Sequence, residues 1–387
     1  MTSNESLLSP GVSRLHAAPE IGRDGAWALP HSEARTRRFG LDLARAAAIL
    51  LVLVSHAVGF WAAFSGALGL DPAVSSRLLG IDGVELFFGL SGFLIGRLLL
   101  DIQRRSPSFE AIKIFLVRRW LRTLPLYFLV LAVLLLVPQL QPIPLERGWS
   151  YVLLVQNLVT PMPASNWFGT SWSLTIEEWS YLLLPFLAFY LCRSTRNPVA
   201  SAALILIALG IAIRLGFGLT HAPWTAVRWD DLIRKTVITR ADAVAYGVLA
   251  AVMMERFGAA LPKYRLLIAG AALLAVNVAI CLKLDSHAGA AGWLLLFPAT
   301  GAGFALMMPW LAGLASPRRL LAAPVHFVAR ISYALYLVHW PFIFMTSAMV
   351  APGFGWCVIF FAGSFAVASV LSYAIEYPIM RLRPKQI

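Results

Sequence analysis

Charged residues and cysteines are both scarce in this sequence, and each scarcity argues against a class of protein. Asp, Glu, Lys and Arg make up only 13% of the 387 residues, whereas about a quarter of a soluble globular domain is charged. The three cysteines, Cys192, Cys281 and Cys357, lie singly in or beside apolar segments, without the spacing of a disulfide framework or a metal site. We therefore expect neither a soluble domain nor a disulfide-rich secreted one, and no bound metal.

Apolar residues dominate the chain. They account for 59% of it, and the mean hydropathy is +0.75. Apolar segments long enough to cross a bilayer recur without a long polar region between them. The sequence predicts an all-α fold, a polytopic transmembrane helix bundle of about ten spans of roughly 20 residues each. We expect these spans at residues 42–64, 82–101, 117–137, 174–192, 199–219, 238–256, 265–284, 292–314, 328–350 and 354–375.

Two polar tails flank the predicted membrane domain, which covers residues 39–378. Residues 1–38 contain Pro, Ser, Gly and Arg without an apolar run, so they form neither a signal peptide nor a span. We expect them to be a disordered cytoplasmic tail, and residues 379–387 to be a short basic cytoplasmic tail.

The net charge of +13 could indicate nucleic-acid binding, but the positions of the 32 Lys and Arg indicate a membrane topology instead. Most of them lie in the N-terminal tail and in every second loop, beginning with the loop after the second span. Positive charge in short loops marks the cytoplasmic side. We expect both termini in the cytoplasm and no nucleic-acid partner.

Ionisable residues inside spans are functional candidates, because charge in hydrocarbon is costly. Arg45 and His56 share the first span, and eleven helical steps bring them to nearly the same face, about 16 Å apart along the axis. His56 suits proton exchange near neutral pH, but a hydrogen bond between helices would also explain it. Arg45 could extend its charge to the membrane surface.

The start of the third span carries a cluster of three arginines. The spacing places Arg118 and Arg119 beside Arg122 on one helical face. Guanidinium groups bind phosphate oxygens in a bidentate manner, so the cluster suits a polyphosphate. Anchoring at the cytoplasmic surface is the alternative.

Three carboxylates lie at or near the expected outer half of the bundle. Helix packing explains the small residues around Glu85 but not Glu85 itself. Glu177 and Glu178 open the fourth span, where helix capping accounts for only one of them. We expect one of the three, Glu85, Glu177 or Glu178, to orient the His56 imidazole.

Six short sequence motifs, or blocks, occur in a fixed order along the chain, and their order and spacing together are specific for one protein family. The chain from Phe39 to Pro378 resembles the acyltransferase 3 family of bacterial membrane acyltransferases, which O-acylate saccharides and other hydroxylated acceptors. The blocks are Arg45 followed after ten residues by His56, GVELFFGLSGFLIG at 83–96, RRWLRTLP at 118–125, SWSLTIEEWSYLLLP at 171–185, RADAVAYG at 240–247 and ISYALYLVHWP at 331–341.

The resemblance implies a role for each block. It implies an acyl-coenzyme A donor, commonly acetyl-CoA, and His56 as the catalytic residue. The residues expected to bind the donor are Arg45, Arg118, Arg119 and Arg122. Those expected to bind the acceptor are Arg240, Asp242, Tyr336 and His339. The location implied is the inner, cytoplasmic membrane.

Some family members carry a further SGNH hydrolase-like domain, and because only residues 376–387 follow the tenth span we expect a stand-alone membrane acyltransferase. His56 would act as general base on the acceptor hydroxyl, or less favourably as the nucleophile of an acyl-imidazole.

Several alternatives stay open from sequence alone. A transporter or flippase would use intramembrane charges for ion coupling, and a non-catalytic scaffold would not need His56. The acceptor could be a polysaccharide, a lipid-linked saccharide or a small secreted metabolite. The oligomeric state is open.

Overall fold

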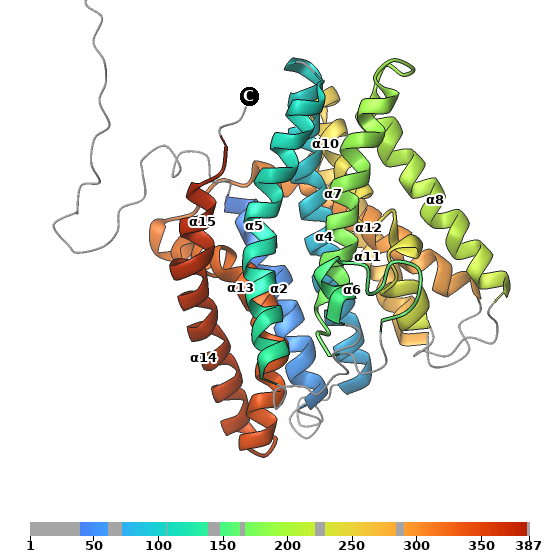
Figure 1. Cartoon of the computed structure of the whole chain (residues 1–387). Helices are drawn as coiled ribbons and strands as arrows, with labels where there is room; N and C mark the ends of the chain where they lie inside the picture. The colour runs from blue at the N-terminus through green and yellow to red at the C-terminus, as the bar shows by residue number, and fades with distance from the viewer. Residues whose placement is uncertain are drawn as a thin grey trace, which may run out of the picture. The chain divides into compact units, whose positions relative to one another are not determined.

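The computed structural model describes residues 39–60, 72–105, 107–137, 148–162, 167–220, 229–283 and 290–384. Throughout these ranges the chain forms helices joined by turns, and no strand occurs. Figure 1 shows the helices gathered into a bundle. The predicted all-α polytopic fold is therefore confirmed. The tail expected at residues 1–38 lies outside the described residues, and its character stays a prediction.

The helices are named in chain order. The first half of the bundle comprises α2 (Phe39–Phe60), α4 (Pro72–Arg105), α5 (Phe109–Leu136), α6 (Gly148–Val152), α7 (Ser171–Leu191) and α8 (Pro198–Thr220). The second half comprises η3 (Asp230–Arg234), η4 (Ile238–Arg240), α10 (Ala245–Phe257), η5 (Gly258–Ala260), α11 (Lys263–Lys283), α12 (Ala290–Gly313), α13 (Arg319–Met349), α14 (Phe354–Leu371), η6 (Ser372–Glu376) and α15 (Tyr377–Arg381).

Eight helical segments within the described ranges are long and apolar enough to cross a membrane. They coincide with eight of the expected spans. The other two expected spans fall on α7 and α11, which are helices of 21 residues each. The first turns of α7 carry buried Ser and Thr residues and the Glu pair. Because this part of α7 faces other helices instead of lipid, it does not need an apolar sequence.

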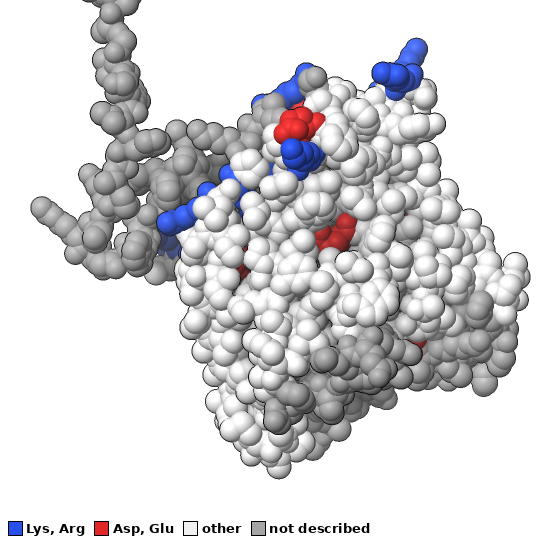
Figure 2. Space-filling model, in the orientation of Figure 1, with Lys and Arg blue, Asp and Glu red and all other residues white. Residues whose placement is uncertain are grey.

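Two helices extend well beyond the predicted spans. Helix α4 has 34 residues and α13 has 31, whereas about 20 residues suffice to cross the hydrocarbon. The surplus turns of α4 carry Arg104 and Arg105 at its end. Figure 2 shows Lys and Arg of one face gathered where α4 leads into α5 and α7 into α8. The expected cytoplasmic side corresponds to this end of the bundle.

Glycine allows α4 to approach α10 closely. A Cβ atom on Gly92 would lie 2.0 Å from the Val244 carbonyl oxygen, and one on Gly247 would lie 2.1 Å from the Gly89 carbonyl oxygen. Small residues at such a crossing let two backbones meet, as in many membrane bundles. This contact fixes the start of α10 against the middle of α4.

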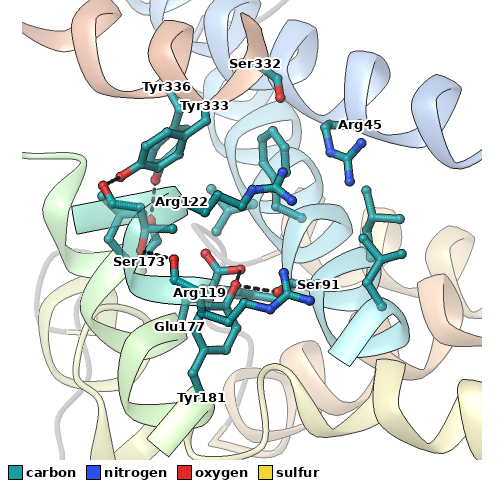
Figure 3. A pocket seen from close by; sticks show the side chains of 17 residues that line it. Arg45, Ser91, Arg119, Arg122, Ser173, Glu177, Tyr181, Ser332, Tyr333 and Tyr336 are labelled. Carbon is teal, nitrogen blue, oxygen red and sulfur yellow. Dashed lines mark hydrogen bonds between the residues drawn. The ribbon is translucent and has the colours of Figure 1, made fainter. Parts of the chain in front are cut away.

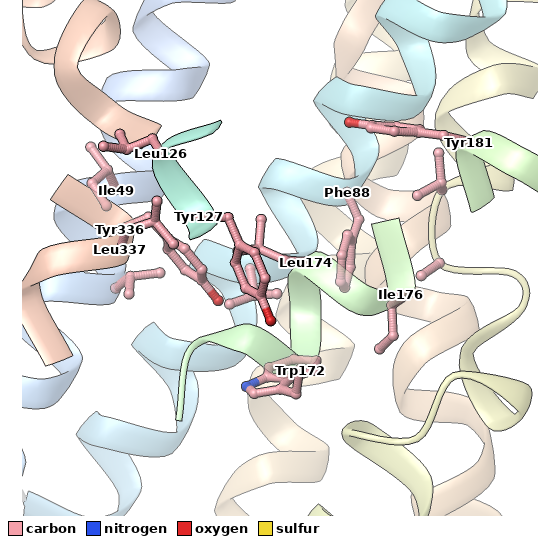
Figure 4. Packing of buried hydrophobic residues seen from close by; sticks show 14 of the residues in the cluster. Ile49, Phe88, Leu126, Tyr127, Trp172, Leu174, Ile176, Tyr181, Tyr336 and Leu337 are labelled. Carbon is pink, nitrogen blue, oxygen red and sulfur yellow. The ribbon is translucent and has the colours of Figure 1, made fainter. Parts of the chain in front are cut away.

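An apolar cluster joins α2, α4, α5, α7 and α13 around the centre of the bundle (Figure 4). Ile49, Leu126 and Leu337 are at most 1% exposed. Tyr336 and Tyr181 belong to the same cluster, and both hydroxyl groups have hydrogen-bond partners. The cluster therefore holds polar side chains at defined positions inside an apolar core.

Candidate active site

Helices α2 and α13 bring two histidines together. Nδ1 of His56 lies 3.3 Å from Nε2 of His339, and the ring centroids are 5.1 Å apart. His339 is fully buried, whereas His56 is half-buried. The Trp340 ring packs edge-on against His56 at 5.1 Å. His339 was expected to bind the acceptor, and the structure instead places it against the expected catalytic histidine.

Hydrogen bonds to the backbone define the protonation of both rings. Nδ1 of His56 lies 3.0 Å from the Val52 carbonyl oxygen, and Nδ1 of His339 lies 3.0 Å from the Leu335 carbonyl oxygen. A carbonyl oxygen only accepts, so each neutral ring carries its proton on Nδ1. Nε2 of His339 then accepts from Nδ1 of His56. Nε2 of His56 is left with a free lone pair, as a general base requires.

A large basic cavity opens between α4, α5 and α10, and we call it the arginine vestibule. Its volume is about 860 Å³, and its charged lining includes the carboxylates Asp101 and Glu255. The arginines that line it are Arg45, Arg97, Arg104, Arg105, Arg118, Arg119, Arg122 and Arg383. All four residues expected to bind the donor are among them, so the structure brings this predicted set together.

A narrow inner pocket continues from the vestibule into the bundle. It shares Arg45, Arg119 and Arg122 with the vestibule and has a volume of about 90 Å³. Figure 3 shows these three guanidinium groups directed into the pocket. The rest of its polar lining consists of Ser91, Thr123, Ser173, Glu177, Tyr181, Ser332, Tyr333 and Tyr336.

Hydroxyl groups are hydrogen-bonded in pairs along this pocket. Tyr336 and Ser173 are hydrogen-bonded at 2.5 Å, and Ser91 and Tyr181 at 2.8 Å. The Tyr336 ring lies 5.7 Å from the His339 ring. The polar lining of the pocket thus ends at Tyr336, whose ring lies beside His339, although neither histidine lines the pocket itself.

Glu177 and Glu178 lie beside the arginines, not beside His56. Glu177 lines the inner pocket and accepts a hydrogen bond from the Tyr181 hydroxyl. Glu178 is buried and accepts from Thr123 at 2.6 Å. Within the described residues neither carboxylate contacts His56. The hydrogen-bond contacts of the His56 ring are instead with Val52 and His339.

The remaining expected site residues form two buried ion pairs. Arg240 contacts Glu85 at 2.6 Å, and Arg214 contacts Asp242 at 2.6 Å. All four side chains are at most 2% exposed. These pairs join α4 and α8 to the turn before α10, so Glu85, Arg240 and Asp242 have a structural partner each. The sequence interpretation had not paired Arg214 with Asp242, because partners on different helices leave no local signal.

The helical turn η3 carries another charged cluster that sequence reasoning missed. Arg234 forms an ion pair with Asp230 and lies over the Trp172 ring, 4.7 Å from its centroid. Lys235 contacts Asp230 at 2.6 Å. Burial favours the neutral acid, but Arg234 and Lys235 lower the pKa of Asp230 to about 2. The i, i+4 spacing of Asp230 and Arg234 was the available sequence signal.

A comparison with protein families decides the membership of the chain. A family model described as an acyltransferase domain, Acyl_transf_3, matches residues 38–377. The chain belongs to the acyltransferase 3 family. The resemblance seen in the six sequence blocks is thereby confirmed, with nearly the same boundaries.

Curated relatives of this family member are bacterial O-acetyltransferases. The peptidoglycan O-acetyltransferase OatA of Listeria monocytogenes is 24% identical over 379 residues, covering 88% of this chain and 55% of the relative. The O-acetyltransferase OatA of Staphylococcus aureus is 30% identical over 200 residues, covering 46% of this chain and 30% of the relative. The matched part of the chain thus spans about half the length of the Listeria protein and less than a third of the Staphylococcus protein. No solved structure matches the chain.

We expect the Arg214–Asp242 pair to stabilise the bundle. Removing one partner of a buried pair leaves an uncompensated charge, so Asp242→Leu should lower the free energy of unfolding by about 3–5 kcal/mol. Thermal unfolding of the purified protein in detergent measures the loss. The double variant Arg214→Met/Asp242→Leu removes both charges and should recover most of it. A stable Asp242→Leu protein that has lost only acceptor binding would instead favour the original role of Asp242.

Proposed function

We propose that this chain is a membrane-bound O-acyltransferase that moves an acetyl group from acetyl-CoA to a hydroxyl group of a cell-envelope saccharide. The observation that carries the proposal is the arginine vestibule with its inner pocket, whose lining residue Tyr336 lies beside the His56–His339 pair. The acetyl group is supported by the names of the curated relatives, and the saccharide acceptor by the peptidoglycan named for the Listeria protein. We place the protein in the cytoplasmic membrane.

The vestibule suits the phosphate end of coenzyme A. Arg118, Arg119 and Arg122 present guanidinium groups that can bind phosphate oxygens in pairs. Arg45 lies where the vestibule meets the inner pocket. The inner pocket is small, so the thioester end of the pantetheine arm is the part of the donor that would enter it. The thioester would then reach the inner end near Tyr336.

The histidine pair supplies the proton transfer. Nε2 of His56 takes the proton of the acceptor hydroxyl while that oxygen attacks the thioester carbonyl carbon. When the tetrahedral intermediate collapses, the carbon–sulfur bond breaks and the thiolate of coenzyme A recovers the proton from His56. His339 holds His56 in the required tautomer through the contact with Nδ1. The same free Nε2 would be the attacking atom in an acyl-imidazole route.

His56→Ala should abolish acyl transfer, because no other group near Tyr336 has a free nitrogen lone pair in the proposed mechanism. Transfer of radiolabel from acetyl-CoA to peptidoglycan fragments by purified protein measures this. The variant should reach the membrane at the normal level. Transfer at the wild-type rate would contradict the assignment, and acceptor movement without acyl transfer would favour a transporter.

His339 should act on kcat and not on the KM for the donor, because it touches His56 and not the vestibule. We expect His339→Leu to lower kcat by roughly 10²-fold or more, in the range of general-base contributions. His339→Gln keeps an oxygen that can accept from Nδ1 of His56 and should retain more activity. Trp340→Phe keeps the ring contact and serves as the control. Equal losses in the Leu and Gln variants would refute the tautomer role.

Arg122 should act on donor binding. It lines both the vestibule and the inner pocket, so Arg122→Gln should raise the KM for acetyl-CoA by about tenfold or more, as loss of a charge-assisted hydrogen bond does. Lys113→Gln on the same helix removes an exposed charge and should have little effect. An unchanged KM in Arg122→Gln would place the donor elsewhere.

A further inference from the structure

The last described turn of the chain returns to the arginine vestibule. Helix α15 and the preceding η6 pack against α5. Arg383, which follows α15, lines the vestibule together with Arg118, Arg119 and Arg122. The Arg118 guanidinium donates a hydrogen bond to the Pro384 carbonyl oxygen. The segment Leu382–Pro384, which the sequence suggested to be only a basic tail, therefore contributes Arg383 to the wall of this cavity and a carbonyl oxygen to Arg118.

The Arg383 side chain is half-buried there, and two of its three guanidinium nitrogens lack a polar partner. Its Nε and Nη2 atoms are inaccessible and form no hydrogen bond. Among the described residues, Arg383 forms no salt bridge, and neither do Arg118, Arg119 and Arg122. Buried polar groups of folded proteins are nearly always hydrogen-bonded. An unpaired guanidinium in a cavity therefore points to a ligand that the cavity holds.

The surroundings of Arg383 carry a surplus of positive charge. Burial, and next the charges of Arg122, Arg119 and Arg118, lower the pKa of Arg383 to about 10. Glu376 is the carboxylate that opposes them, and it also accepts a hydrogen bond from Ser372 at 3.0 Å. Glu177 and Glu178 lie beside Arg119, and Asp101 and Glu255 pair with Arg105 and Arg104. With Arg45 and Arg97 also in the lining, the cations still outnumber these carboxylates. A bound polyanion would both neutralise the charge and satisfy the free donors.

Arg381 shows what simple anchoring at the membrane surface looks like in the same segment. It lies only two residues before Arg383, is exposed, and stacks on the Tyr377 ring at 4.9 Å. Arg381 does not line the vestibule. The two arginines would be equivalent in a count of positive charge, but only Arg383 is directed into the cavity.

We propose that Arg383 and the segment Leu382–Pro384 complete a polyphosphate-binding site on α5, with Arg383 as a further residue that binds the phosphates of the donor. This inference rests on the proposed function, because that function supplies a phosphorylated donor. An anionic lipid headgroup offers the same phosphate chemistry, and the experiment below separates the two sources.

The test uses the full chain in nanodiscs of zwitterionic phosphatidylcholine. Calorimetry measures the Kd of coenzyme A and of adenosine 3′,5′-bisphosphate, which has the phosphates but no thiol. Arg383→Gln should weaken both by about tenfold or more, since it removes a charged donor. Arg381→Gln should leave both within about twofold, because exposed charges contribute little. Since removal of a buried cation relieves repulsion, Arg383→Gln without ligand should unfold at no lower temperature than the wild type.

Each other outcome overturns the inference in a distinguishable way. If Arg383→Gln binds coenzyme A normally while Arg122→Gln does not, the inference fails and the proposed function stands. If the wild type binds neither compound, both fail. If Arg383→Gln alters only the effect of added phosphatidylglycerol, the ligand is a lipid and Arg383 does not serve the donor. If Arg383→Gln lowers the unfolding temperature and leaves both Kd values unchanged, the residue is structural.

Discussion

The hydrocarbon of a bilayer contains no water that could solvate a charge, so a charged side chain in this bundle needs a partner from the protein or from a ligand. This constraint sorts the charged residues of the bundle into two groups. Glu85, Asp242 and their arginine partners are buried and paired at 2.6 Å. The arginines of α5 and Arg383 form no salt bridge in the described part of the chain. The first group holds helices together, and the second group is available to an anion.

The paired group also explains how the site is positioned. Arg240 and Glu85 lock the start of α10 against α4, where Gly92 and Gly247 let the backbones meet. Helix α4 in turn packs along α2, which carries His56. His56 therefore lies on a helix that packs along α4, which buried charge and close backbone contact fix against α10. A general base needs such rigidity, because its geometry decides proton transfer.

Sequence reasoning predicted the features that depend on one helix at a time. The lengths of apolar segments gave the ten helical positions, and helical periodicity placed Arg118, Arg119 and Arg122 on one face, where the vestibule now joins them to Arg45. It did not predict partners between helices. Glu177 was assigned to His56 and lies instead beside the arginines, because neither the depth nor the rotation of α7 relative to α2 can be derived from spacing within α7.

Arg383 illustrates a second limit of sequence reasoning. A basic residue after the last span satisfies the positive-inside rule, and the same residue type binds phosphate. Arginine after the last span is therefore compatible with either role. Arg383 and Arg381 differ only in the direction of the side chain, since Arg383 lines the vestibule and Arg381 stacks on Tyr377. The number of positive charges in a loop therefore predicts that the loop is cytoplasmic, but it does not predict which arginine binds phosphate.

The difference in size between the two cavities bears on the choice between a transferase and a carrier. The vestibule, at about 860 Å³, is as large as a ligand pocket, but the inner pocket has only about 90 Å³, whereas pockets for small molecules span roughly 300–1,000 Å³. A volume of about 90 Å³ is too small for a saccharide unit, whereas it can take the thioester end of an acyl donor. Because neither histidine lines the inner pocket, the proposed function requires the acceptor to approach His56 from outside that pocket, with only the acyl end of the donor inside it.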